Sequence, residues 1–310
     1  MNKIALSVEN LTKVYTDNKK KWSSLKALNH ITFEVMQGEV FGVLGPNGAG
    51  KTTFLNILSG TVVKTDGTVN VWGFDLDRNP RQVRASIGIV PQEVNLDAFF
   101  SPKQLLELQA GLYGVKEKDR ITDLILKMVS LDKQANSYSR SLSGGMKRRL
   151  LIAKAMVHQP PILILDEPTA GVDVELRKNL WENVKELNKV GVTIILTTHY
   201  LFEAQEMCNR IAIINKGNLV ALDTTQKLLD RIQTKKITFK VEKIENNLKL
   251  KLEGIDFKIS SENTIVATFE KDTDKFNLLL DFLKLNNLKI LDIATDDGDL
   301  EDVFVQLTKS

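Results

Sequence analysis

The sequence predicts a large α/β domain with buried parallel strands in its core, followed by a small α+β domain. The apolar runs 161–165 and 192–196 have the composition of strands that are buried on both faces of a parallel sheet. A glycine-rich loop separates a strand-like run from a segment of helical spacing, which is a connection typical of α/β folds. Past about Leu228 the composition changes, and 310 residues are enough for both domains.

Composition argues against several functional classes. A net charge of +3 provides no global basic field, so no nucleic-acid partner is expected. The single cysteine, Cys208, cannot form an intramolecular disulfide, and the N-terminus lacks an apolar signal segment. Both features predict a cytoplasmic protein, and the longest apolar runs are too short to cross a bilayer.

The first strands alternate in the manner of an antiparallel pair, at 4–9 and 31–35, with Tyr15 on the connection between them. Tyr15 could stack on an adenine, or it could be an ordinary half-buried aromatic at a strand end. The polar, basic stretch 17–22 predicts an enlarged loop. This loop is either solvated or makes a contact with lipid headgroups or a partner.

The segment 45–53 fits the pattern of Gly, four residues, Gly-Lys-Thr, between a strand at 39–44 and helical spacing at 54–58. Its glycines let backbone N–H groups turn toward a phosphate, and the helix N-terminus adds partial positive charge. We expect Lys51 to bridge the β- and γ-phosphates and the Thr52 hydroxyl to hold Mg²⁺. The sequence therefore predicts a nucleoside triphosphate site.

Further along, strands at 68–72 and 87–90 precede Gln92, which falls at a strand end where ligands gather in α/β sheets. Helical spacing at 103–113 and 121–131 predicts a helical insertion. Ser143 is the expected N-cap of a helix that runs to Met156. With Gly144 and Gly145 it forms an anion-binding start, although a plain cap would need only the serine.

Two later strands end in polar groups at the same expected edge. The strand beginning at Ile162 ends in Asp166, expected to hold Mg²⁺, and in Glu167, expected to polarise the attacking water. The strand 193–198 delivers His199 to this edge.

In this order and spacing, the motifs resemble those of the ATPase subunit of an ABC transporter over roughly residues 4–225. The resemblance implies a P-loop NTPase fold of ABC type, in which a mixed sheet core carries an antiparallel β subdomain and a helical subdomain at about 93–157. This ATPase domain would span 1–228, and 229–310 would form a C-terminal α+β accessory domain.

The resemblance also implies roles for individual residues. Glu167, His199 and Gln92 would be catalytic, and Thr52, Gln92 and Asp166 would hold Mg²⁺. The ATP-binding residues would be Tyr15, Gly45, Pro46, Asn47, Gly48, Ala49, Gly50, Lys51, Thr52, Thr53, Ser143, Gly144, Gly145 and Asp173. Ser143 to Gly145 would form the signature loop, and Asp173 would communicate across a dimer interface.

The segment 146–149, Met-Lys-Arg-Arg, is similar to that of ATPases serving two-component drug and polysaccharide exporters. The implied function is ATP hydrolysis by a head-to-tail homodimer that powers export through a separate permease, on the inner face of the cell membrane. Segment 93–100 is a candidate docking surface for the permease, unless Phe99 and Phe100 simply pack inside the insertion.

The chief alternative is a soluble ABC ATPase that acts on nucleic acid or ribosomes. Residues 54–141 contain no sustained heptads of the kind that DNA-repair relatives need, and the chain carries one cassette where ribosome-acting relatives usually have two. A non-enzymatic ATP sensor would have lost Glu167 or His199, and both are present.

Overall fold

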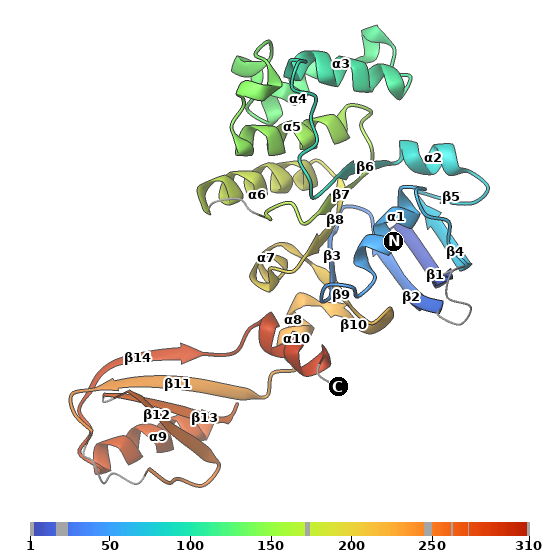
Figure 1. Ribbon diagram of the computed structural model, residues 1–310. Coiled ribbons are helices and arrows are strands. Elements are labelled where there is room, and N and C mark those ends of the chain that lie inside the picture. The colour runs from blue at the N-terminus through green and yellow to red at the C-terminus, as the bar shows by residue number, and fades with distance from the viewer. Residues whose placement is uncertain are drawn as a thin grey trace. The chain divides into compact units, whose positions relative to one another are not determined.

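The structure is a computed structural model that describes residues 3–16, 24–170, 174–244, 250–261, 263–271 and 273–308. The chain forms two compact units, residues 1–224 and 225–310 (Figure 1). The boundary expected at Leu228 falls inside α8 (Thr225–Leu229), which belongs to the second unit.

The centre of the first unit is a six-stranded sheet in the order β10-β9-β3-β8-β7-β6. Five of its strands, β9, β3, β8, β7 and β6, run parallel, and β10 pairs antiparallel with β9. The mixed sheet core predicted from the sequence is thus confirmed. Its strands are β3 (Val40–Leu44), β6 (Ile87–Val90), β7 (Ile162–Asp166), β8 (Thr193–Thr198), β9 (Arg210–Asn215) and β10 (Asn218–Thr224).

A second, antiparallel sheet has the order β2-β1-β4-β5. Its strands are β1 (Ile4–Thr16), β2 (Ser24–Met36), β4 (Asp66–Val71) and β5 (Phe74–Asp75). The prediction that Tyr15 lies on the connection was wrong, because the β1–β2 ladder continues to the end of both strands and pairs Tyr15 with Leu25. The predicted loop 17–22 lies outside the described residues.

An apolar core joins the two sheets through α1 (Lys51–Leu58). Phe33 of β2 stacks on Phe41 of β3 at 5.2 Å between ring centroids, and Phe54 of α1 lies 5.5 Å from Phe33. All three rings are buried, so the helix that follows the phosphate loop is held rigidly by both sheets.

The predicted helical insertion is present in the first unit. There α3 (Pro102–Leu112), α4 (Thr122–Met128) and α5 (Gly144–Met156) pack together, with 3₁₀ turns at Glu117–Asp119, Asp132–Gln134 and Ser139–Ser141. The helix α4 is shorter than predicted because the backbone turns left-handed at Ser130. Three further helices were not predicted from the sequence: α2 (Pro80–Ala85), α6 (Val174–Lys189) and α7 (Leu201–Met207).

The second unit is a four-stranded antiparallel sheet in the order β12-β13-β11-β14, with a core shared with α9. The elements are β11 (Thr234–Val241), β12 (Ile255–Ser261), β13 (Thr264–Glu270), α9 (Thr273–Leu285), β14 (Ile290–Asp296) and α10 (Leu300–Thr308). Asp299 accepts hydrogen bonds from the N–H groups of Glu301 and Asp302 at the start of α10, as expected for a helix N-terminus.

Candidate functional site

The phosphate loop connects β3 to α1 and requires its glycines. A Cβ on Gly45 would overlap the carbonyl oxygen of Ile214 in β9, because the loop passes close to that strand. Gly50 has a left-handed φ of 114°, and a Cβ there would lie 2.5 Å from Ala27 O. Since Gly50 gives α1 no side-chain cap, the N–H groups at the start of that helix are suited to bind an anion.

Lys51 is the buried cation of this loop. Its side chain is only 7 % exposed, and Nζ donates to Gly45 O at 2.6 Å and Pro46 O at 3.2 Å. Burial lowers the pKa of Lys51, while the carboxylates of Glu167 and Asp166 oppose that change. A partly desolvated ammonium beside the N-terminus of α1 fits a polyphosphate.

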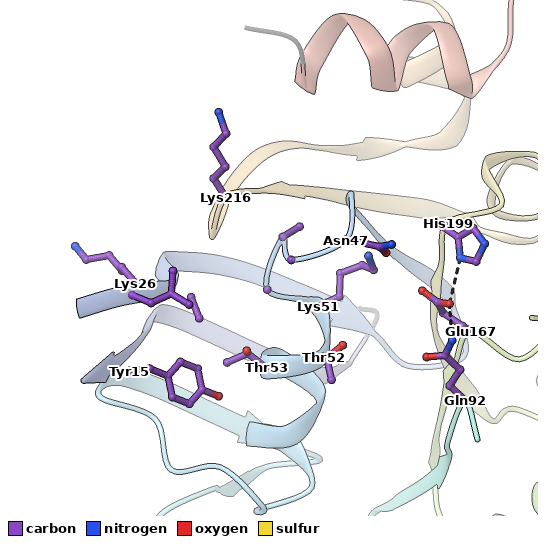
Figure 2. Close-up of a pocket in the computed structure, with 15 residues that line it drawn as sticks. Tyr15, Lys26, Asn47, Lys51, Thr52, Thr53, Gln92, Glu167, His199 and Lys216 are labelled. Atoms are coloured by element: carbon purple, nitrogen blue, oxygen red, sulfur yellow. Dashed lines mark hydrogen bonds and ion pairs between the residues drawn. The ribbon is translucent and has the colours of Figure 1, made fainter. Parts of the chain in front are cut away.

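A cavity of about 870 Å³ opens beside Lys51 (Figure 2). This volume lies in the range of sites that hold a nucleotide-sized ligand. Of the predicted site residues it brings together Tyr15, Asn47, Gly48, Ala49, Gly50, Lys51, Thr52, Thr53, Gln92, Glu167 and His199. The cavity therefore joins the phosphate loop to the polar groups at the ends of β6, β7 and β8.

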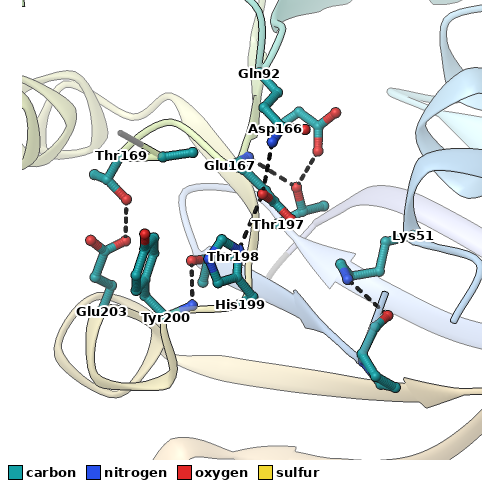
Figure 3. A network of polar contacts seen from close by, with 12 residues as sticks. Lys51, Gln92, Asp166, Glu167, Thr169, Thr197, Thr198, His199, Tyr200 and Glu203 are labelled. Carbon is teal, nitrogen blue, oxygen red and sulfur yellow. Dashed lines mark hydrogen bonds and ion pairs between the residues drawn. The ribbon is translucent and has the colours of Figure 1, made fainter. Parts of the chain in front are cut away.

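Glu167 lies at the centre of a polar cluster (Figure 3). Its Oε2 accepts a hydrogen bond of 3.1 Å from Gln92 Nε2, and the same oxygen lies 3.1 Å from His199 Nδ1. The three residues follow β6, β7 and β8, which are adjacent parallel strands, so their carboxyl ends meet at one edge. The predicted shared edge is present in the structure.

The backbone of Glu167 is left-handed, with φ of 44°, which is unusual for a residue with a Cβ. Its N–H donates to Thr197 O at 2.9 Å and contacts Thr197 Oγ1 at 3.3 Å. The same hydroxyl donates to Asp166 Oδ1 at 2.6 Å. Thr197 thus holds both Asp166 and Glu167 in place. A strained backbone like that of Glu167, held by its surroundings, is frequent at functional sites.

Behind this cluster lies a buried carboxylate, Glu203 of α7, which is 4 % exposed. It accepts a 2.7 Å hydrogen bond from Thr169 Oγ1 and lies 3.2 Å from Arg177 Nε. Burial raises the pKa of Glu203, and the contacts with Thr169 and Arg177 oppose the change. The hydrogen bond from Thr169 to Glu203 joins the segment that follows Glu167 to α7, the helix that follows His199.

None of the signature-loop residues lines the cavity; Ser143 and Gly144 are exposed, and Gly145 is buried. Ser143 is the N-cap of α5 and accepts from Met146 N at 3.3 Å. A Cβ on Gly144 would meet nothing within 4 Å. The carbonyl oxygens of Gly45 and Pro46 accept hydrogen bonds from Lys51, and Asp173 lies outside the described residues.

Sequence reasoning missed part of the cavity wall, namely Leu25, Lys26, Ala27 and Lys216. Lys216 lies in the β9–β10 turn, whose Gly217 N donates to Ala49 O at 2.9 Å. A Lys-Gly pair between apolar runs is a turn signal, but nothing local indicates which loop the turn contacts.

Phe99 and Phe100 follow Gln92 in a segment without helix or strand. Phe99 is 73 % exposed and Phe100 is 39 % exposed, so the alternative that these rings simply pack inside the insertion is wrong. Two consecutive exposed aromatic side chains are typical of a surface that contacts another molecule.

Comparison with known proteins points to one family. A family model described as ABC transporter matches residues 28–170. The linearmycin resistance ATP-binding protein LnrL of Bacillus subtilis is 38 % identical over 217 residues, covering 69 % of this chain and 70 % of the relative. The Nod factor export ATP-binding protein I of Cupriavidus metallidurans is 37 % identical over 228 residues, covering 73 % of each.

Solved structures agree with these relatives. The ATP binding subunit of an ABC transporter has a TM-score of 0.64 at 28 % identity, covering 73 % of this chain and 92 % of that one. A dimeric post-hydrolysis state of the ATP-binding cassette MJ0796, bound to ADP and Pi, has a TM-score of 0.61 at 26 % identity, covering 71 % and 98 %.

Proposed function

The chain belongs to the ABC transporter family and is an ATPase subunit; from this premise we propose that two copies close head to tail around ATP and drive export through a separate permease. The observation that carries the proposal is the single cavity that has Lys51 on one side and the Gln92–Glu167–His199 cluster on the other.

In this proposal ATP binds with its phosphates against residues 45–53 and its adenine near Tyr15. The Tyr15 ring is 39 % exposed and lines the cavity, which supports a stacking role. Lys51 would contact the β- and γ-phosphates, and Thr53 offers a further hydroxyl beside them.

The residues present fit a Mg²⁺ ion brought in with the nucleotide. Thr52 and Gln92 line the cavity. Asp166, the last residue of β7, is not among the lining residues but would supply a carboxylate oxygen, the kind of donor that Mg²⁺ prefers. When bound, the ion would neutralise charge on the phosphate oxygens. Glu167 would polarise the attacking water, and His199 would contact the γ-phosphate.

The dimer is supported by what one copy lacks. The residues that line the cavity include much of the phosphate loop but not Ser143 to Gly145, and Ser143 and Gly144 are exposed elsewhere on the first unit. A second copy arranged by two-fold symmetry would supply those N–H groups to the γ-phosphate, and each site would need both chains. Asp173 would lie between the sites in this arrangement.

The permease is proposed because transport needs a membrane path. None of the helices in the described ranges combines the length and apolar character that crossing a bilayer requires. The exposed Phe99 and Phe100 support segment 93–100 as the surface that docks the permease. The relatives are named for linearmycin resistance and Nod factor export, which supports export as the direction of transport. The ATPase would then be held at the inner face of the membrane.

The test uses the Glu167→Gln variant. We expect this variant to bind ATP but to hydrolyse it slowly, so that a stable ATP-bound dimer accumulates. The mass of this dimer is measured by light scattering after size-exclusion chromatography. Glu167→Gln combined with Lys51→Ala is the control, because it should stay monomeric with ATP. A single variant that binds ATP and remains monomeric would contradict the dimer.

A second measurement tests the partner. Affinity purification from native membranes should recover a multi-span protein in about equal amount, and Phe99→Ser with Phe100→Ser should reduce that recovery while ATP binding is kept. Recovery of ribosomes or nucleic acid in its place would overturn the transport proposal.

A further inference from the structure

Arg148 is a buried arginine that joins helix α5 to two other segments of the first unit. It lies one turn into α5 and is 3 % exposed. Its Nη1 donates to Pro91 O at 3.0 Å and to Gln92 O at 2.7 Å. Its Nη2 donates to Ala170 O at 3.5 Å. A buried guanidinium is costly unless it is hydrogen-bonded, so these carbonyls fix where the side chain can lie.

Both partner segments of Arg148 lead directly to Glu167. Gln92, whose carbonyl accepts from Arg148, donates its own amide to Glu167 Oε2 at 3.1 Å. Ala170, the other acceptor, donates its N–H to Glu167 O at 3.1 Å. Arg148 therefore contacts the segments that hold the Glu167 side chain and backbone, without touching Glu167 itself.

The position of Arg148 on α5 connects these contacts to the signature loop. Ser143, Gly144 and Gly145 start the helix, and five residues of α-helix span about 7.5 Å, so Arg148 moves with them as one rigid body. In the proposed dimer that loop binds the ATP of the partner copy, whereas Gln92 and Glu167 act on the ATP of their own chain.

We propose that Arg148 is a positioning residue that transmits engagement of the signature loop with one ATP to the Glu167 that faces the other ATP. It makes hydrolysis at the two sites cooperative. The inference deepens the proposed function and rests on the head-to-tail dimer. A shift of α5 on ATP contact displaces the 91–92 carbonyls and Ala170 together, and Glu167 moves with them.

Arg149, the next residue of α5, is a matched control. Its Nη1 donates to Val129 O at 2.8 Å and to Ser130 O at 3.0 Å, which both follow α4 within the helical insertion. It is thus an arginine on the same helix whose hydrogen bonds go to two carbonyls of the helical insertion, and not to Gln92 or Ala170. Replacing it disturbs the packing of α5 without breaking the link to Glu167.

The experiment compares Arg148→Gln, Arg148→Lys and Arg149→Gln in the full chain. Wild type should hydrolyse ATP with a Hill coefficient of about 2, as expected for two coupled sites. Arg148→Gln should bring the coefficient to about 1 and lower kcat about ten-fold, with ATP affinity of the monomer unchanged. Arg148→Lys should recover part of the cooperativity, because an ammonium can still donate to Gln92 O.

Mixed dimers show on which chain Arg148 acts. In a dimer of Arg148→Gln with Glu167→Gln, the only intact catalytic carboxylate belongs to the chain without Arg148, and hydrolysis should be slow. The second dimer pairs a wild-type chain with a chain that carries both Arg148→Gln and Glu167→Gln. Here the only intact Glu167 lies in the chain that keeps Arg148, and the rate should be about ten-fold higher.

Equal rates in the two mixed dimers would overturn the inference, and so would equal loss of cooperativity in Arg149→Gln and Arg148→Gln. A wild-type protein that forms no dimer with ATP, even as Glu167→Gln, would instead refute the proposed function on which the inference rests. The two failures are therefore distinguishable by the size of the ATP-bound species.

Discussion

The amide Nε2 of Gln92 donates a 3.1 Å hydrogen bond to the carboxylate Oε2 of Glu167, 75 positions away in the sequence. The contact holds the carboxylate toward the cavity from the end of a neighbouring strand. The amide donor is neutral, so it orients the carboxylate without placing a second charge beside it.

Changing this amide should change the pH dependence of hydrolysis. In Gln92→Glu a second carboxylate faces Glu167, and like charges raise the pKa of the pair, so the acid limb of the kcat profile should move to higher pH. Gln92→Ala removes the donor without adding charge and should lower kcat about ten-fold with a smaller displacement of that limb. Superimposable pH profiles for the two variants would refute the role given to this contact.

Two glycine substitutions should separate folding from dimer formation. Gly144→Ala adds a methyl group to open space on the monomer, so its thermal midpoint should equal that of wild type. The methyl would nevertheless occupy the surface that faces the partner's ATP, and ATP-driven dimerisation should be lost. Gly45→Ala, whose Cβ overlaps Ile214 O, should lower both the midpoint and ATP affinity. Normal dimers of Gly144→Ala would count against the head-to-tail arrangement.

Lys51 should be needed for ATP binding in a way that the other lysines lining the cavity are not. Lys51→Met removes the buried ammonium and should reduce ATP affinity by about 100-fold or more, measured by equilibrium binding of a fluorescent ATP analogue. Lys216→Met lies on the same cavity wall and is the control, with an expected change of about three-fold or less. Comparable losses in both variants would contradict a special role for Lys51.

The stability of the first unit should fall at acid pH through His158. Its ring stacks on Tyr113 at 3.7 Å, and Nε2 lies 3.1 Å from Ile87 O, while Nδ1 is buried without a partner among the described residues. Burial lowers the pKa of His158 below its usual 6.5, so the neutral ring stabilises the folded state above that pH.

This stabilisation is lost as the pH falls below 6.5 toward the folded-state pKa, because the unfolded chain then binds the proton more readily. Thermal midpoints measured from about pH 8 to about pH 5 should therefore decline less steeply for His158→Phe than for wild type. Tyr113→Phe, which keeps the stacking ring and the histidine, should decline as wild type does. Parallel curves for His158→Phe and wild type would exclude this explanation.

The hydroxyl of Thr169 should stabilise the region next to the Gln92–Glu167–His199 cluster. Thr169 is fully buried and donates to Glu203 Oε2 at 2.7 Å. Thr169→Val leaves a buried carboxylate oxygen without its donor and should lower the free energy of unfolding by about 1–3 kcal/mol. Thr169→Ser keeps the hydroxyl and should cost less. Equal unfolding midpoints in denaturant for the two variants would show that the hydrogen bond is not what matters.

Much of the first unit could be predicted because its signals are local. The glycine spacing of 45–50, the apolar run before Asp166 and the Ser-Gly-Gly start of α5 each identify a strand end or a helix start from neighbouring residues. Elements with weaker local signals were missed. In β14 nearly every side chain is exposed, so no apolar alternation indicates the strand.

The sequence by itself determined the chemistry of this protein: an anion-binding loop, two carboxylates and a histidine at strand ends, and a separate glycine-containing helix start. Only the tertiary structure decided which of these groups meet. Gln92 and His199 both contact Oε2 of Glu167 because β6, β7 and β8 are neighbours in the sheet. Arg148 reaches Gln92 because α5 packs against β6. Local spacing cannot encode such contacts, since they depend on the order of strands in the sheet and on side chains that lie tens of residues apart.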